Sequence, residues 1–163
     1  MTSLAGITER AAAVADQGPT LIVQDDAFYQ CPSGRLKLRV FSEAEGELIF
    51  YRRADQTGPK ESFYVRTPTA CPESLGNTLA LAYGEIGRVK KRRTLFIVGR
   101  TRVHLDVVEG LGEFVELEVV LRDGESAEEG AREAKQLMST LGIDASQLID
   151  RAYVDLLAEQ SRR

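Results

Sequence analysis

Two glutamates separated by a single residue, Glu116 and Glu118, are the side chains whose spacing points most directly to chemistry. They lie in a stretch where apolar and polar residues alternate, which predicts a β-strand with both carboxylates on one face. Adjacent carboxylates repel each other unless a cation lies between them, and oxygen ligands suit a hard divalent ion such as Mg²⁺ or Mn²⁺. Asp106, on the preceding predicted strand, is expected to join this metal site.

A second pattern places basic side chains on one face of several predicted strands. Residues 34–41 alternate strictly, with Arg35, Lys37 and Arg39 on one side and apolar residues on the other. A single strand of this kind is more often a solvated sheet face than a binding site. Repetition on neighbouring strands, however, predicts a cationic surface that needs an anion to neutralise it. The same spacing pairs Tyr51 with Arg53, Tyr64 with Arg66, Lys91 with Arg93, and Arg102 with Asp106.

Basic and acidic strands that face one cavity are suited to binding a polyphosphate. Arginine can hold phosphate oxygens through two parallel hydrogen bonds, and lysine can do so as a point charge. A metal ion between the carboxylates and the phosphate would polarise the phosphorus centre or position the nucleophile. We therefore expect the following side chains to converge on one cavity: Lys37, Arg39, Lys91, Arg93, Arg102, Asp106, Glu116 and Glu118.

These residues must be positioned by a fold that the periodicity predicts to be α+β, with a dominant antiparallel sheet. Apolar residues at three- and four-residue steps predict a helix over residues 3–16, which Gly18-Pro19 would end. Ser126 and Glu129 form a capping box for a helix that would reach about Leu141. Further helices are predicted over residues 72–83 and after Asp144. Strands are predicted over residues 20–29, 34–41, 47–53, 62–67, 87–98, 100–108 and 113–122.

Composition argues against several other classes of protein. The 163 residues carry a net charge of −4, whereas proteins that wrap nucleic acid carry a positive excess. Residues 90–93 are basic, but they divide between the two faces of a strand. Cys31 and Cys71 have neither disulfide nor metal-ligand spacing, and the one histidine, His104, makes no zinc site by itself. Residues 1–16 are amphipathic, unlike a signal peptide, and no apolar run could span a membrane, so a cytoplasmic location is expected.

The residues around the two glutamates resemble the most recognisable block of the CYTH superfamily. This block comprises residues 104–106 (HLD) and 109–118 (EGLGEFVELE). Residues 34–39 (GRLKLR) resemble the family's basic strand near its start, and residues 91–96 (KRRTLF) resemble its central basic pair. The order and spacing agree from about Tyr29 to Leu157. Members of the superfamily include class IV adenylyl cyclases, thiamine triphosphatases and inorganic triphosphatases.

The resemblance implies a triphosphate tunnel, an antiparallel barrel of about seven or eight strands with flanking helices, formed here by a single domain over residues 1–163. It implies Mg²⁺ or Mn²⁺ as cofactor, and ATP or inorganic triphosphate as the bound small molecule. Nucleic acid and membrane are not expected as partners, and a homodimer is left open. The implied phosphate-binding residues are Lys37, Arg39, Arg53, Arg66, Lys91, Arg93 and Arg102. The implied catalytic residues are Lys91, Arg93 and Asp106, and the implied metal ligands are Glu116, Glu118 and Asp106.

One departure from the family pattern concerns the start of the chain. The family begins with a strand bearing Glu-x-Glu-x-Lys, whose carboxylates help to hold metal and whose lysine contacts phosphate. Residues 1–16 contain no such motif, so either the true start of the protein lies upstream, or the protein lacks one wall of the tunnel and one set of metal ligands. Loss of this wall would bear more on catalysis than on the fold.

Three readings of function follow from the sequence. In the first, the protein is a metal-dependent enzyme that converts ATP to cyclic AMP and pyrophosphate, or that hydrolyses an inorganic or organic triphosphate. In the second, it is a binding module that grips a polyphosphate or nucleotide without turnover. In the third, it binds a partner protein through the open edge of its sheet.

Overall fold

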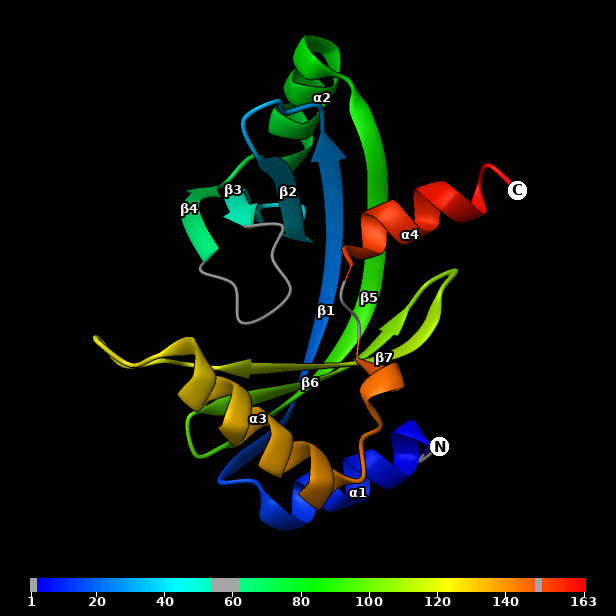
Figure 1. The fold of residues 1–163 in the computed structure, drawn as a ribbon. Helices are drawn as coiled ribbons and strands as arrows, with labels where there is room; N and C mark the ends of the chain where they lie inside the picture. Colours follow the sequence, from blue (N-terminus) through cyan, green and yellow to red (C-terminus); the bar gives the residue numbers. More distant parts are fainter. Residues whose placement is uncertain (1–2, 54–61, 149–150) are drawn as a thin grey trace. The chain divides into compact units, whose positions relative to one another are not determined.

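The structure of the protein is a computed structural model that describes residues 3–53, 62–148 and 151–163 (Figure 1). Its centre is a seven-stranded sheet with the strand order β4-β3-β2-β1-β5-β6-β7. The strands are β1 (Gln17–Tyr29), β2 (Arg35–Ser42), β3 (Glu45–Arg53), β4 (Ser62–Thr69), β5 (Glu85–Val98), β6 (Thr101–Val108) and β7 (Gly112–Val119). The helices are α1 (Leu4–Val14), α2 (Pro72–Tyr83), α3 (Ala127–Leu141) and α4 (Tyr153–Gln160), with a short 3-10 helix η1 (Ala145–Gln147). The predicted α+β class with an antiparallel sheet is confirmed.

The chain divides into two compact units, and strands β1 and β5 contribute to both. The first, here called the α3 unit, comprises residues 1–22 and 92–151, and the second, the α2 unit, comprises residues 23–91 and 152–163. The prediction that residues 1–163 form one domain stays a prediction. Among the described residues, no helix is long and apolar enough to cross a membrane.

The α3 unit has a core made by α1, α3 and the paired strands β6 and β7. Helix α3 starts at a complete capping box of Ser126 and Glu129, and Gly142 ends it in the left-handed conformation, as the sequence predicts. Leu137 and Leu141 on α3 pack with Ile7 and Ala11 of α1. The core includes Phe96, Val103, Leu105 and Val115 from the strands. Because these side chains alternate along β6 and β7, the register also fixes which residues share the other face.

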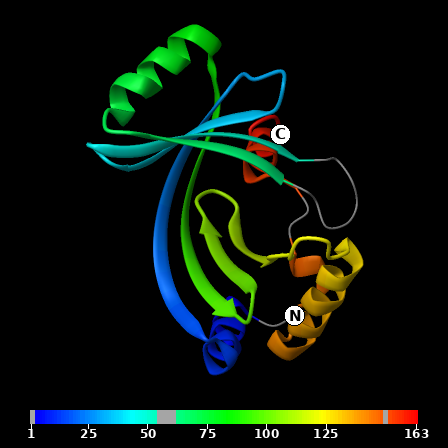
Figure 2. The ribbon, with the colours of Figure 1, turned by 90° about the vertical axis from the view of Figure 1, so that its left-hand side faces the viewer.

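The α2 unit is a meander in which β1, β2, β3 and β4 pair antiparallel in chain order (Figure 2). Its apolar side buries Leu38 of β2 against Leu79 of α2 and Tyr29 of β1. Helix α4 buries Tyr153 and Val154. A side chain at Gly87 of β5 would approach Cγ2 of Val154 to 2.6 Å, so glycine allows α4 to lie against this strand.

Two boundary predictions are wrong. Gly18-Pro19 does not end the first helix, because α1 stops at Val14 and both residues lie within β1. Gly18 has a φ of 108°, and a Cβ there would lie 2.6 Å from the carbonyl oxygen of Leu95, so this glycine permits close approach of the β1 and β5 backbones. The last strand ends at Val119 rather than near Arg122.

Candidate functional site

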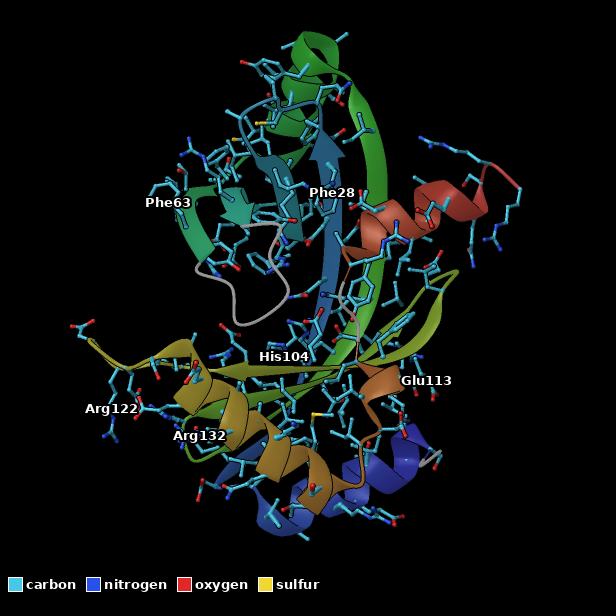
Figure 3. All side chains as sticks on the ribbon, viewed as in Figure 1. Phe28, Phe63, His104, Glu113, Arg122 and Arg132 are labelled. Carbon is cyan, nitrogen blue, oxygen red and sulfur yellow. The ribbon has the colours of Figure 1, made fainter. Side chains whose placement is uncertain are left out.

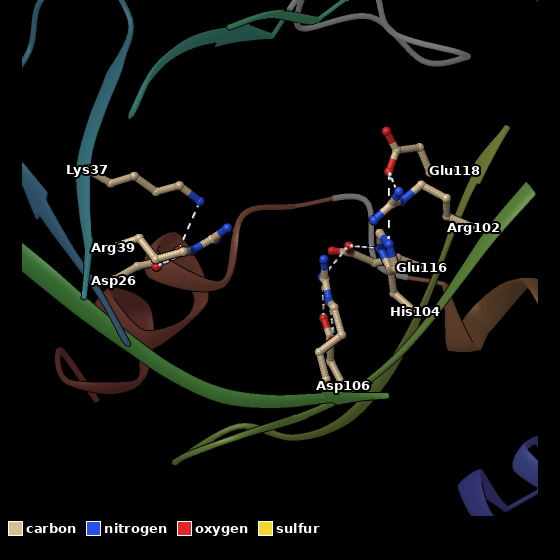
Figure 4. A network of polar contacts seen from close by, with 9 residues as sticks. Asp26, Lys37, Arg39, Arg102, His104, Asp106, Glu116 and Glu118 are labelled. Carbon is tan, nitrogen blue, oxygen red and sulfur yellow. Dashed lines mark hydrogen bonds and ion pairs between the residues drawn. The ribbon is translucent and has the colours of Figure 1, made fainter. Parts of the chain in front are cut away.

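A buried carboxylate holds the two cations of β2 in the α2 unit. The strand register sets Asp26 of β1 opposite Arg39 of β2, so Asp26, Lys37 and Arg39 share one sheet face. Oδ1 of Asp26 accepts a hydrogen bond from Nε of Arg39 at 2.8 Å, and Oδ2 accepts from Nη2 of Arg39 at 2.7 Å and from Nζ of Lys37 at 3.0 Å (Figure 4). The side chains of Lys37 and Arg39 are only 16% and 12% exposed. We call these three residues the Asp26 cluster.

Burial and charge act against each other in this cluster. Burial raises the pKa of Asp26, but the hydrogen bond from Arg39 and the positive charges of Lys37 and Arg39 outweigh it, so the pKa lies below its ordinary value. Burial lowers the pKa of Lys37 to about 8, although the negative charge of Asp26 opposes this shift. With Lys37 protonated, two cations face one carboxylate, which leaves an excess positive charge that is poorly solvated.

The remaining predicted phosphate-binding residues of the α2 unit have varied surroundings. Lys91 is half-buried, and its Nζ lies 4.9 Å from the centre of the Tyr153 ring. Arg66 is exposed on β4, with its guanidinium carbon 5.7 Å from the centre of the Tyr64 ring. Arg53 falls within β3, but its side chain lies outside the described residues.

Arg93 joins two carboxylates in the α3 unit. Its Nε and Nη2 donate to the two carboxylate oxygens of Asp106, each at 2.7 Å, and Nη2 also donates to Oε2 of Glu116 at 2.9 Å. The Asp106 side chain is fully buried, and that of Arg93 is 12% exposed. A bidentate pair with this geometry fixes the direction of the guanidinium. We call these three residues the Arg93 cluster.

Glu116 and Glu118 lie on one face of β7, opposite His104 and Arg102 of β6. Oε2 of Glu116 lies 3.5 Å from Nδ1 of His104, and Oε2 of Glu118 lies 3.9 Å from Nε2 of the same ring (Figure 4). Nε of Arg102 is 3.7 Å from Oε2 of Glu118, and both of these side chains are largely exposed. The two glutamates therefore flank one histidine.

The predicted metal ligands fit a divalent ion unequally. Among the described residues, no group of three or more His, Cys, Asp or Glu is arranged to hold a metal ion. Asp106 directs both carboxylate oxygens to Arg93, so its geometry is that of an anchor for the guanidinium. Nδ1 of His104 is buried without a hydrogen-bond partner beside Glu116. Buried polar atoms are normally satisfied, so this atom marks the side of β7 where Glu116 and Glu118 would meet a ligand.

Sequence reasoning missed Asp26 and gave His104 no role. A signal for Asp26 was available, because two successive aspartates at positions 25 and 26 of a strand must point to opposite faces. Asp25 pairs with the more exposed Arg88, whereas Asp26 is buried with the cations of β2. His104 was interpreted as structural because a lone histidine gives no ligand pattern in the sequence. The register of β6 and β7 is what places it next to both glutamates.

Each of the two units contains its own group of charged residues from the predicted site. The α2 unit gathers Asp26, Lys37 and Arg39, and the α3 unit gathers Arg93, Asp106 and Glu116, with Arg102, His104 and Glu118 on the same face of β6 and β7. That all the predicted residues converge on one cavity stays a prediction.

Comparisons with known proteins identify the class to which this fold and these charged strands belong. A family model for the CYTH domain matches residues 4–153. The chain is 26% identical to the adenylate cyclase CyaB of Aeromonas hydrophila, in an alignment that covers 91% of this chain and 81% of that protein. The class is therefore that of enzymes that act on triphosphates and are generally metal-dependent. The chain belongs to the CYTH domain family.

Solved structures agree on the fold. The PH1012 protein of Pyrococcus horikoshii OT3 matches with a TM-score of 0.81 at 21% identity, over 95% of this chain and 94% of that one. The PH1819 protein of the same organism matches with a TM-score of 0.72 at 20% identity, over 96% of this chain and 94% of that one. At these identities the similarity establishes the fold alone.

Proposed function

We propose that this protein is a metal-dependent enzyme that converts ATP to cyclic AMP and pyrophosphate. The observation that carries the proposal is the pair of buried cations on β2, Lys37 and Arg39, which share a single carboxylate. Buried charges are costly unless they are paired, so an excess cation on a sheet face this little exposed is expected to serve an anionic ligand. The similarity to an adenylate cyclase of Aeromonas hydrophila supports the choice of reaction.

In this proposal the Asp26 cluster binds phosphate oxygens. Asp26 holds the guanidinium of Arg39 by two hydrogen bonds, so the side chain is oriented before substrate arrives and little rotamer entropy remains to be lost. Lys37 supplies a compact charge beside it. Phosphate oxygens would share these donors with Asp26, which remains as the counter-charge on the far side of the cations.

The Arg93 cluster is proposed to stabilise negative charge on the reacting phosphate. Asp106 fixes Arg93 from behind, and the Nη2 contact to Glu116 would be exchanged for a phosphate oxygen. Lys91 would add a second cation. Glu116 and Glu118 are the residues that would hold a divalent ion, which when bound supplies Lewis-acid polarisation of a phosphoryl oxygen. Asp106 is assigned to positioning Arg93 instead.

Cyclisation and hydrolysis would use the same cations. In cyclisation, the ribose 3′-oxygen forms a bond to the α-phosphorus, its proton is released, and the bond from that phosphorus to the bridging oxygen breaks, so that pyrophosphate leaves. In hydrolysis, a water oxygen forms a bond to the terminal phosphorus and one of its protons is released. The bond from that phosphorus to the bridging oxygen breaks, so the diphosphate part leaves and the attacked group becomes orthophosphate. Because the side chains serve both reactions equally, a triphosphatase is the second candidate function, and a binder without turnover is the third.

The test is to incubate the protein with ATP and Mn²⁺ and to identify the products by chromatography. Cyclic AMP together with pyrophosphate supports the proposal, whereas orthophosphate without cyclic AMP selects a triphosphatase. If no product forms, melting curves with inorganic triphosphate show whether the protein binds triphosphate without turnover or does not bind it at all. A ligand that binds only the folded state raises its stability. Sodium sulfate at matched ionic strength controls for screening. A melting temperature that triphosphate leaves unchanged would overturn every triphosphate function.

The finer points of location and assembly stay predictions. A cytoplasmic location, the absence of nucleic-acid partners and a homodimer are not needed for the chemistry proposed, and each requires its own measurement.

A further inference from the structure

A row of aromatic rings lies on the same sheet face as the Asp26 cluster. The register sets Phe28 of β1 opposite Lys37 of β2, and Tyr51 of β3 opposite Tyr64 of β4. Nζ of Lys37 lies 5.7 Å from the centre of the Phe28 ring and 5.3 Å from that of Tyr51. The Tyr51 and Tyr64 rings are stacked, with centroids 5.8 Å apart and planes inclined by 25°. The row therefore leads from the buried cations to the edge strand.

Exposure changes along this row. Phe28 is 5% exposed and Tyr51 is 7% exposed, whereas Tyr64 is 43% exposed. The inner rings are thus part of the packed sheet face, and the outer ring presents aromatic surface to solvent. Stacking on Tyr51 fixes the plane of this outer ring.

A purely structural role explains only part of this arrangement. Cross-strand aromatic pairs stabilise antiparallel strands, and the opposite face of the same two strands has such a pair in Phe50 and Phe63, with centroids 6.5 Å apart. That second pair lies on the face opposite Lys37 and Arg39, as the alternation of side chains along a strand requires, and the guanidinium of Arg52 packs on both of its rings. Tyr64 differs from Phe63 in sharing its face with Lys37 and Arg39.

We propose that Tyr64, backed by Tyr51, stacks against the aromatic heterocycle of an organic triphosphate, and so gives the protein a preference for a nucleoside triphosphate over inorganic triphosphate. The inference rests on the proposed function in one respect, since it takes the phosphates to bind at Lys37 and Arg39. Strands β2 and β4 are two strand spacings apart, roughly 10 Å, which a base and its phosphates can bridge. Arg66, beside the Tyr64 ring, adds a guanidinium that can stack on or donate to the same heterocycle.

The experiment measures the binding of four ligands by calorimetry in EDTA, which prevents turnover. The ligands are ATP, thiamine triphosphate, ribose 5-triphosphate and inorganic triphosphate. Wild-type protein should bind ATP more tightly than ribose 5-triphosphate. Tyr64→Ala should weaken ATP binding by roughly 5- to 20-fold, the lower part of the range for loss of one base–aromatic stack, because Tyr51 remains. Binding of inorganic triphosphate should stay within about twofold of wild type, since no phosphate contact involves the ring.

Matched variants separate stacking from packing. Phe63 lies on β4 (Figure 3). Phe63→Ala removes an aromatic ring of similar exposure from the neighbouring position on the opposite face, and it should leave the binding of all four ligands unchanged. Tyr64→Phe keeps the ring and should keep the preference for ATP. Tyr64→Leu keeps apolar bulk without an aromatic face and should lose the preference, and it replaces Tyr64→Ala if that variant does not fold.

Three results would overturn the inference. Equal affinity of the wild type for ATP and ribose 5-triphosphate would remove any role for the base. Equal weakening of all four ligands by Tyr64→Ala and Tyr64→Leu would make the ring structural. Tighter binding of thiamine triphosphate than of ATP would replace the nucleoside by another heterocycle. Failure of the proposed function has a different signature, because inorganic triphosphate itself then fails to bind the wild-type protein.

Discussion

At the scale of single residues, Asp26 is the residue that allows two cations of β2 to be buried on one sheet face. Lys37 and Arg39 are neighbours on one strand face, and their mutual repulsion would be large in a poorly solvated position. One carboxylate that contacts both makes the arrangement stable and leaves an excess positive charge. The same principle operates at Arg93, where the charges are reversed and one guanidinium satisfies two carboxylates.

Replacing Asp26 by asparagine keeps the shape of the side chain but removes its charge. Because breaking a buried ion pair leaves uncompensated charge, Asp26→Asn is expected to lower the free energy of unfolding by about 3 kcal/mol. Inorganic triphosphate should then raise the melting temperature more than it does for wild type, since the ligand takes over the neutralisation of Lys37 and Arg39. Differential scanning fluorimetry with and without triphosphate measures both effects.

The neighbouring aspartate provides the control. Asp25→Asn removes the same charge from the opposite face, where its partner Arg88 is 54% exposed, so its effect on stability should be small. Equal destabilisation by the two variants, with equal responses to triphosphate, would mean that the Asp26 cluster has no special relation to anions.

Lys37 makes stability depend on pH in an unusual direction. Its pKa is about 8 in the folded protein, against 10.5 for the ordinary side chain. Between these values the unfolded chain binds more protons, so the free energy of unfolding should rise with pH, with a slope of at most about 1.4 kcal/mol per pH unit from this residue. Urea unfolding of wild type and Lys37→Met at pH 7.5 to 9.5 tests this: the difference between them should change with pH in favour of wild type.

Binding of triphosphate should show the opposite trend. Lys37 loses its positive charge as the pH rises through about 8, so the affinity of wild type should fall over the same interval in which its stability rises. Lys37→Met, with no charge to lose, should lack this fall. A parallel decline of affinity in both proteins would assign the pH dependence to another group.

At the scale of helices and strands, the sequence was informative wherever a local rule sets the structure. The alternation of residues 34–41 predicted β2, and the capping box at Ser126 predicted the start of α3, because both signals act within a few residues. Helix α2 was predicted with its observed bounds. The CYTH fold was predicted as well, from motifs that lie on these strands.

The parts that were not predicted depend on pairing between strands. The role of Asp26 follows from its register with Arg39, and the position of His104 follows from its register with Glu116. A single sequence does not show which residue of one strand opposes which residue of the next. Gly18 was misread for a related reason: it resembles a helix stop, whereas its function is to let two strands approach closely.

The capping box of α3 makes a prediction at this scale. Ser126→Ala removes the hydroxyl that accepts the backbone N–H of Glu129, and should lower the free energy of unfolding by about 1 kcal/mol. For a chain of this length, the melting temperature should fall by roughly 2–4 °C. Ser139→Ala is the control, because Ser139 is exposed within the helix and its hydroxyl donates to the carbonyl of Lys135. If both variants melt alike, the box contributes nothing beyond helix propensity.

At the scale of the whole molecule, the two units divide the charge between them. Buried cations exceed carboxylates in the Asp26 cluster, whereas two carboxylates surround one guanidinium in the Arg93 cluster. An anion without metal would bind the cations of the Asp26 cluster. A divalent cation would bind Glu116 of the Arg93 cluster and the neighbouring Glu118. The function proposed above calls for both kinds of group, because its substrate is an anion and its cofactor a divalent cation.

The roles proposed for the two groups can be separated by changing Glu116 and Glu118 together to glutamine. The replacement keeps the size and hydrogen-bonding capacity of both side chains but removes the charge that attracts a divalent ion. Without metal, the variant should bind inorganic triphosphate within about threefold of wild type, because Lys37 and Arg39 are unchanged. With Mn²⁺, its turnover of ATP should fall by at least about a hundredfold, since the metal acts on the transition state.

Glu113→Gln combined with Glu109→Gln is the matched control, because both residues are exposed near the turn between β6 and β7 and the same two charges are lost. Calorimetry with triphosphate in EDTA measures the first effect, and product formation over a series of Mn²⁺ concentrations measures the second. An increased Mn²⁺ requirement, with activity recovering at high concentration, would still identify the glutamates as ligands. Turnover that is unchanged at every Mn²⁺ concentration would show that these carboxylates do not hold the metal.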